Sequence, residues 1–145
     1  MISPESIGTT VTFSKTVGEY DVYAFAGVTG DFSPNHVNHE YMADSPYGQR
    51  IVHGALLVGY MSTASVAMIN RLGVDAVSYG YDRVRFPTAA LFGDTLTVTY
   101  ELVEVEPGGN KSKGKVTVTR QNGDVVAAAI HLLYCFEKGD RKSTV

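Results

Sequence analysis

The longest uncharged stretch of the chain predicts the central element of its fold. No Asp, Glu, Lys or Arg occurs between Arg50 and Arg71. Residues 54–72 are too long a run, and too poor in β-branched residues, for a strand. Because the run is apolar or small on every side, it predicts a buried helix. The uncharged stretch between Arg50 and Arg71 also contains His53, glycines and hydroxyl side chains, which make it too polar for a membrane span.

The residues before this helix predict a strand, a second helix and a loop. Residues 9–15 alternate between polar and apolar side chains, as a strand does. Residues 17–28 predict a helix that begins near Gly18 and carries acidic residues in its first turn. Two glycines and a proline predict that residues 27–36 form a loop without regular structure. Asn38 is a candidate N-cap for a short helix over residues 39–43.

After Gly73 the pattern changes to a period of two, which predicts strands. The predicted strands cover residues 76–86, 95–106, 113–120 and 125–136. The apolar positions change phase near Leu102 and Val103, which predicts a bulge or a strong bend. Asn122 and Gly123 form a typical hairpin turn. The last strand is almost continuously apolar, which predicts a central position in the sheet or burial on both faces.

This order of elements predicts one α+β domain that covers residues 1–145, with a polar tail from about residue 138. The connections between the strands are too short for crossovers, so the sheet is expected to be antiparallel. Such a sheet hides an apolar helix by curling around it. The other side of the helix still needs cover, and a second copy of the chain would supply it, so we expect at least a homodimer.

Charge and cysteine content exclude several classes of protein. The formal net charge is -3 and no basic tract stands out, so we expect no nucleic-acid partner. Cys135 is the single cysteine and lies in an apolar run, which indicates packing and excludes an internal disulfide. The N-terminal residues do not form a signal peptide, and a reducing cytoplasm is the expected compartment.

Asp31 and His36 lie five residues apart in the predicted loop and are the candidate catalytic pair. A carboxylate and an imidazole on one loop can hold a single water, and an imidazole exchanges protons near neutral pH. A turn-forming aspartate beside a surface histidine is the alternative interpretation. A metal held by Asp31, His36 and His39 is also imaginable. No further ligand falls at a suitable spacing, so we expect no metal.

The start of the long helix is the candidate site for stabilising negative charge. The first N–H groups of a helix have no partner within it and carry partial positive charge. Gly54 lets a carbonyl group approach the backbone closely, so its amide is the predicted oxyanion donor. Ser62 lies two turns further along. Its hydroxyl either supports Asp31 or the substrate, or bonds back to its own helix.

Four segments carry a resemblance to a known family. Residues 25–36 read FAGVTGDFSPNH, residues 50–54 read RIVHG, and residues 85–87 and 93–96 read RFP and GDTL. In this order they resemble the MaoC-like, (R)-specific enoyl-CoA hydratases, and the resemblance covers roughly residues 9–136. It implies the hot-dog fold, in which a sheet wraps a central helix. It also implies that Asp31 and His36 are catalytic, and it supports Gly54 as the oxyanion donor.

The resemblance also implies a substrate, a coenzyme A (CoA) or carrier-bound acyl thioester, and no cofactor. Phe32, Ser33, His53 and Ser62 are the predicted substrate-binding residues. The family often has Asn at the position of Ser33, and Ser makes similar local backbone hydrogen bonds. Aromatic residues that can line an acyl pocket, and basic residues that can bind the CoA phosphates, are Phe32, Tyr47 and Tyr60, and Arg50, Arg83, Arg85 and Lys113.

Two other functions remain open for a chain of this pattern. A hot-dog thioesterase often places an Asp or Glu on the central helix, and residues 51–70 hold neither. A non-catalytic module that binds acyl thioesters would not need both Asp31 and His36. Within the predicted class, a dehydratase for branched or carrier-bound acyl groups is indistinguishable from a simple enoyl-CoA hydratase.

Overall fold

A five-stranded antiparallel sheet forms the frame of the molecule. The computed structural model describes residues 1–139. The strand order is β1-β3-β4-β5-β2, and every neighbouring pair is antiparallel. The strands are β1 (Thr10–Thr16), β2 (Ala76–Arg85), β3 (Thr95–Val105), β4 (Lys111–Thr119) and β5 (Val125–Cys135).

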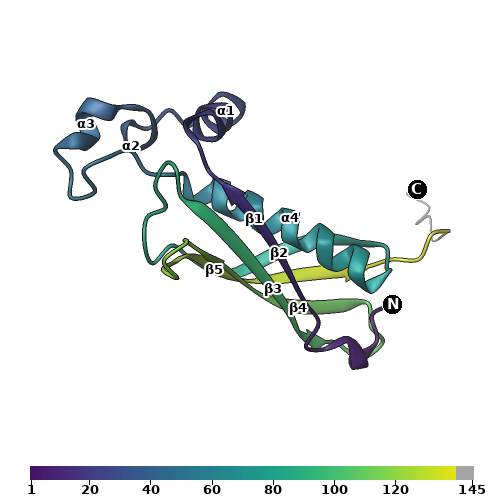
Figure 1. The fold of residues 1–145 in the computed structure, drawn as a ribbon. Coiled ribbons are helices and arrows are strands. Elements are labelled where there is room, and N and C mark those ends of the chain that lie inside the picture. The colour runs from purple at the N-terminus through teal and green to yellow at the C-terminus, as the bar shows by residue number, and fades with distance from the viewer. Residues whose placement is uncertain (140–145) are drawn as a thin grey trace.

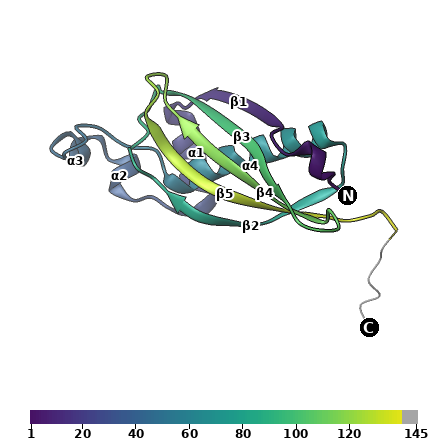
Figure 2. The same ribbon diagram turned by 90° about the horizontal axis from the view of Figure 1, so that it is seen from below.

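One long helix lies along a single face of this sheet, and the sheet curls around it (Figures 1 and 2). The shorter helices α1, α2 and α3 gather at one end, near the start of the long helix (Figure 1). Within residues 1–139, no helix is both long and apolar enough to cross a membrane. The helices are η1 (Pro4–Ser6), α1 (Glu19–Thr29), α2 (Pro34–Val37), α3 (His39–Ala43) and α4 (Gly54–Leu72).

The core lies between α4 and the inner face of the sheet. From α4, Leu57, Met61 and Met68 are buried there. Strand β3 buries every second side chain between Leu96 and Leu102, which is the period of a half-buried strand. The α+β class and the hot-dog arrangement are therefore confirmed.

Several local predictions are confirmed as well. The register of β3 against β4 shifts between Leu102 and Glu104, where the apolar phase changes. Strand β5 lies between β4 and β2, and its burial largely alternates, so its apolar run reflects an interior position in the sheet. The Asn38 side chain caps α3 by accepting the N–H of Tyr41.

One prediction needs correction. The segment 27–36 was expected to lack regular structure, yet α2 begins at Pro34. A proline at the first helical position lacks only an N–H that would be unpaired anyway, so here it starts a helix. The central helix was expected to need a second copy of the chain to cover its outer side. The sheet covers one face of α4, and Val66 on the other face is 53% exposed. The predicted tail lies outside the described residues from residue 140 onwards.

A chain of hydrogen-bonded polar side chains, with His131 and Tyr100 buried, crosses the sheet. The hydroxyl of Tyr100 lies 2.9 Å from Nδ1 of His131, and Nε2 of His131 lies 2.7 Å from the hydroxyl of Ser78. Tyr100 also crosses above Gly114, where a Cβ atom would collide with the tyrosine ring. Burial lowers the pKa of His131 from 6.5 to about 4, since the charged imidazolium would lose its hydration.

This shift predicts a stability loss at mildly acidic pH. Below pH 6.5 the unfolded chain protonates His131, whereas the folded chain keeps it neutral down to about pH 4. The stabilising contribution is therefore complete above pH 6.5, and about 3 kcal/mol of it is lost as the pH falls to 4. Urea unfolding of wild type and His131→Asn across this range measures the difference. An identical pH dependence of the two proteins would contradict the prediction.

Candidate functional site

The loop that follows α1 places Asp31. Gly30 ends α1 in the left-handed conformation, with a φ of 82°, and its N–H bonds to the carbonyl of Ala26. This favours glycine there, because other residues rarely adopt a positive φ. The carboxylate of Asp31 then accepts the N–H of Ser33 at 3.2 Å through Oδ1, which leaves Oδ2 for other partners. The side chain is 50% exposed.

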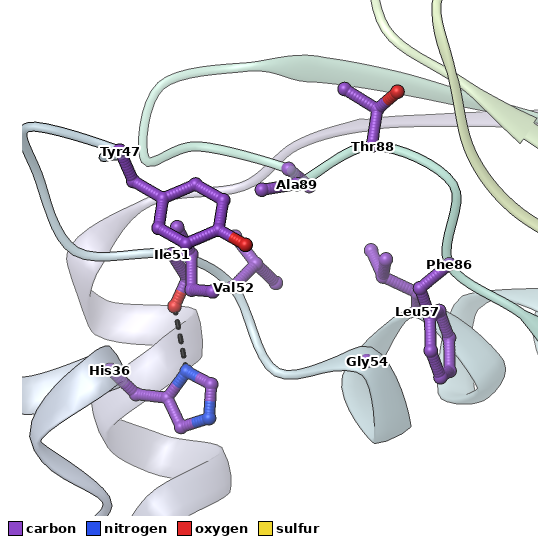
Figure 3. Close-up of a pocket in the computed structure, with 10 residues that line it drawn as sticks. His36, Tyr47, Ile51, Val52, Gly54, Leu57, Phe86, Thr88 and Ala89 are labelled. Carbon is purple, nitrogen blue, oxygen red and sulfur yellow. Dashed lines mark hydrogen bonds between the residues drawn. The ribbon is translucent and has the colours of Figure 1, made fainter. Parts of the chain in front are cut away.

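Helix α2 presents His36 to this carboxylate. Nδ1 of His36 lies 2.8 Å from the carbonyl oxygen of Ile51 (Figure 3). A carbonyl oxygen only accepts hydrogen bonds, so Nδ1 carries the hydrogen, and Nε2 of the neutral ring has a free lone pair. Nε2 lies 4.0 Å from Oδ2 of Asp31. That distance is too long for a direct hydrogen bond and suits one water between the two atoms.

His53 lies behind this pair and supports both members. The residue is 1% exposed, and its Nε2 donates to the backbone carbonyl oxygen of Asp31 at 3.0 Å. Its ring stacks on that of His36, with centroids 3.7 Å apart and an interplanar angle of 26°. Within the described residues, its Nδ1 is buried without a hydrogen-bond partner. His53 therefore fixes both the loop and the imidazole of the candidate pair.

Asp31, His36 and His53 also form a candidate metal cluster. Their possible ligand atoms lie within 4.8 Å of one another. Two features oppose a metal here. The lone pairs of stacked imidazoles run side by side instead of converging on one point, and Nε2 of His53 already carries a hydrogen for the Asp31 carbonyl. The arrangement suits proton transfer better than metal binding.

A cavity of about 220 Å³ adjoins His36 and reaches the first residue of α4. Figure 3 shows His36 and Tyr47 on one side of this space and Phe86 on the other, with Gly54 at the helix start between them. The N–H groups of the first turn of α4 therefore lie at the cavity, where a helix N-terminus favours negative charge. The lining residues are His36, Tyr47, Ile51, Val52, Gly54, Leu57, Phe86, Thr88, Ala89 and Ala90.

The outer wall of the cavity is tied to a distant hairpin. Asp94 is buried and its Oδ2 accepts the N–H of Leu91 at 2.8 Å. The same carboxylate pairs with Arg120 at 2.8 Å and accepts a hydrogen bond from Gln121 at 2.9 Å. Arg120 and Gln121 belong to the turn between β4 and β5. One buried carboxylate thus joins the segment that lines the cavity to that turn.

The structure brings together only some of the residues predicted from sequence. His36 and Gly54 line the cavity with Tyr47, and Asp31 lies beside His36. Phe32 and Ser62 are exposed and lie outside the lining of this cavity. Their roles in substrate binding, like that of Ser33, stay predictions.

Other aromatic and basic candidates have defined partners. Tyr60 is a core residue, and burial raises its pKa to about 12. Arg50 is held by Glu19 and by the hydroxyl of Tyr23, and Lys113 is paired with Glu104. Sequence reasoning did not predict that the carbonyl of Ile51 binds His36 or that the ring of Phe86 lines the cavity. A sequence does not show which backbone groups or apolar side chains come together in the fold.

Comparisons with known proteins agree with this fold. Residues 3–123 match the MaoC like domain, so the chain belongs to that family. The chain is 32% identical to the (R)-specific enoyl-CoA hydratase of Rhodospirillum rubrum over 69% of this chain and 67% of that protein. It is 35% identical to 3-hydroxyacyl-thioester dehydratase Z of Mycobacterium tuberculosis over 66% of this chain and 64% of that protein.

The aligned residues thus span about two thirds of these relatives, and both relatives bear the names of hydro-lyases. Among solved structures, the (R)-hydratase from A. caviae matches with a TM-score of 0.81. That match covers 88% of this chain and 95% of the other, at 23% identity, and it shows the shared fold. The predicted MaoC-like membership is confirmed.

The contacts of His53 predict a stabilising role for its ring. His53→Ala removes the donor to the Asp31 carbonyl and leaves a cavity beneath His36. We expect the free energy of unfolding to fall by roughly 2–4 kcal/mol, from the lost hydrogen bond and the lost packing. His53→Gln keeps a side-chain N–H and is expected to lose less. Denaturant unfolding of the three proteins tests this, and an unchanged His53→Ala midpoint would contradict it.

Proposed function

We propose that this protein is a hydro-lyase that reversibly hydrates a trans-2-enoyl-CoA to an (R)-3-hydroxyacyl-CoA. The observation that supports this most directly is the hydrogen bond from His36 Nδ1 to the Ile51 carbonyl. It leaves His36 Nε2 as an acceptor that faces the Asp31 carboxylate at 4.0 Å. The names of the curated relatives support the same reaction class.

One water between these two acceptors is the proposed nucleophile. It donates one hydrogen to Oδ2 of Asp31 and the other to Nε2 of His36, so an oxygen lone pair points at C3 of the substrate. As the C3–O bond forms, a proton passes from the water to Asp31. The same proton is then delivered to C2, which restores the carboxylate. Hydroxyl and proton therefore add to one face of the double bond.

The Gly54 amide is the proposed partner of the thioester oxygen. Addition at C3 places negative charge on that oxygen before C2 is protonated, and a preorganised N–H stabilises such charge. Gly54 is the first residue of a 19-residue helix and lines the same cavity as His36. We propose His53 as the positioning residue that keeps Asp31 and His36 in place.

A thioesterase is the second candidate function, and α4 argues against it. A hot-dog thioesterase often places a carboxylate on the central helix as base or nucleophile. Residues 51–70 contain neither Asp nor Glu. The carboxylate of Asp31 lies on a loop instead and faces His36. A module that only binds acyl thioesters would not need the carboxylate of Asp31 and the imidazole of His36 to face each other.

We also propose that the chain works as a homodimer. The outer face of α4 is exposed over its whole length, and it carries no charged residue before Arg71. An uncharged helix face of this length is atypical of a surface that meets water. A second copy of the chain covers it in this proposal. The exposed positions before Arg71 are Ala55, Gly59, Ser62, Thr63, Val66 and Asn70.

Turnover of crotonyl-CoA tests the proposed reaction. Loss of the conjugated enoyl thioester is followed in the ultraviolet, with 3-hydroxybutyryl-CoA identified as the product. Asp31→Asn and His36→Ala are each expected to lower kcat by about 100-fold or more, because the first removes the base that takes the proton and the second removes an acceptor of the water. Asp44→Asn and His39→Ala, exposed neighbours of the same types, are expected to retain wild-type rates. Release of free thiol instead of hydration would indicate a thioesterase.

Sedimentation equilibrium tests the proposed dimer. Wild type is expected at twice the chain mass of 15.6 kDa. Val66→Glu places a charge on the uncovered face of α4 and is expected to shift the protein towards the monomer. Val103→Glu, on an exposed valine of β3, is the control and is expected to leave the mass unchanged. A monomeric wild type at micromolar concentration would contradict the proposal.

A further inference from the structure

The ring of Phe86 rests directly on Gly54. A Cβ atom at Gly54 would lie 2.7 Å from Cε2 and 2.8 Å from Cζ of that ring, closer than real Cβ atoms approach. Gly54 does not have a positive φ, so its backbone conformation is open to other residues. A side chain at position 54 would therefore have to displace the ring of Phe86.

Phe86 is also half-exposed, at 48%, immediately after the last residue of β2. An aromatic ring that only filled space would gain more from full burial. Instead, one part of the ring packs on the helix start and the rest remains accessible. The accessible part borders the cavity that contains His36 and Gly54 (Figure 3).

The same ring borders a second hollow. This groove has a volume of about 360 Å³ and extends from Phe86 to Arg120. The cavity and the groove share four lining residues, so the two spaces adjoin each other, and Phe86 is one of the residues at their junction. A molecule that occupies both would run alongside these residues. The shared residues are Tyr47, Phe86, Thr88 and Ala89.

We propose that Phe86 is a substrate-positioning residue that sets how a thioester meets the Gly54 amide. This inference rests on the proposed hydratase function. The thioester group lies across the ring, with one arm of the substrate in the cavity and the other in the groove. The enoyl thioester is planar, so a flat ring beside Gly54 restricts the angle at which its carbonyl approaches the N–H. Correct orientation of this kind contributes directly to rate.

This arrangement couples positions 54 and 86. In Gly54→Ala the backbone N–H remains, but the new Cβ displaces the Phe86 ring. The defect of Gly54→Ala then arises from the displaced ring. Removing the ring as well should therefore restore much of the lost function. If the two residues acted independently, their effects would multiply.

A double-mutant cycle on crotonyl-CoA hydration measures this coupling. We expect kcat/KM to fall about 10-fold in Phe86→Ala and about 100-fold in Gly54→Ala. In the double variant we expect kcat/KM to return to the level of Phe86→Ala. Phe136→Ala, an exposed aromatic outside both hollows, is the control and should match wild type. Multiplied losses in the double variant would overturn the proposal, as would a wild-type rate in Phe86→Ala.

Binding of butyryl-CoA separates this proposal from the hydratase function. Butyryl-CoA is saturated and cannot be hydrated, so calorimetry reports positioning without chemistry. We expect weaker binding in Phe86→Ala and Gly54→Ala, and partial recovery in the double variant. If the variants show this pattern of butyryl-CoA binding but the wild type does not hydrate crotonyl-CoA, the hydratase function is refuted and the positioning role of Phe86 is retained. A wild type that neither binds nor hydrates would overturn both.

Discussion

The backbone of residues 51–53 holds the candidate site together. The carbonyl of Ile51 fixes the orientation and the tautomer of His36, and the ring of His53 holds the carbonyl of Asp31. The N–H of Val52, between these two residues, donates to the carbonyl of Ala90 in the cavity wall, and α4 begins at Gly54. Three consecutive residues thus bring together a loop, a helix start and a cavity wall. The site is arranged before a substrate arrives, which spares the reaction the cost of reorganising polar groups.

The sequence was informative wherever one local property decides the structure. The absence of charge over residues 54–70 revealed α4, and the phase change at Leu102 revealed the bulge. It misled where one residue type has two roles. Proline interrupts a helix at most positions but is favoured at the first position of a helix, where Pro34 stands in α2. The stacking of His53 on His36 could not be predicted, because it joins residues 17 positions apart through the folding of the intervening loop.

The departure from the family at Ser33 has a simple structural explanation. The contact of this residue with Asp31 is made by its backbone N–H, which every residue except proline possesses. Orientation of the Asp31 carboxylate is therefore compatible with either serine or asparagine at position 33. A side chain in a recognised motif need not owe its place to its own functional group.

The buried carboxylate of Asp94 connects Leu91, which directly follows the cavity-lining residues 88–90, with Arg120, in the turn between β4 and β5. Substitutions in the turn between β4 and β5, which contains none of the proposed catalytic residues, can therefore change the shape of this cavity. Substitutions in the turn can shift the wall through the shared carboxylate while the water-binding pair stays intact. Proteins with this fold can in this way diverge in the acyl groups they accept before they diverge in the reaction they perform.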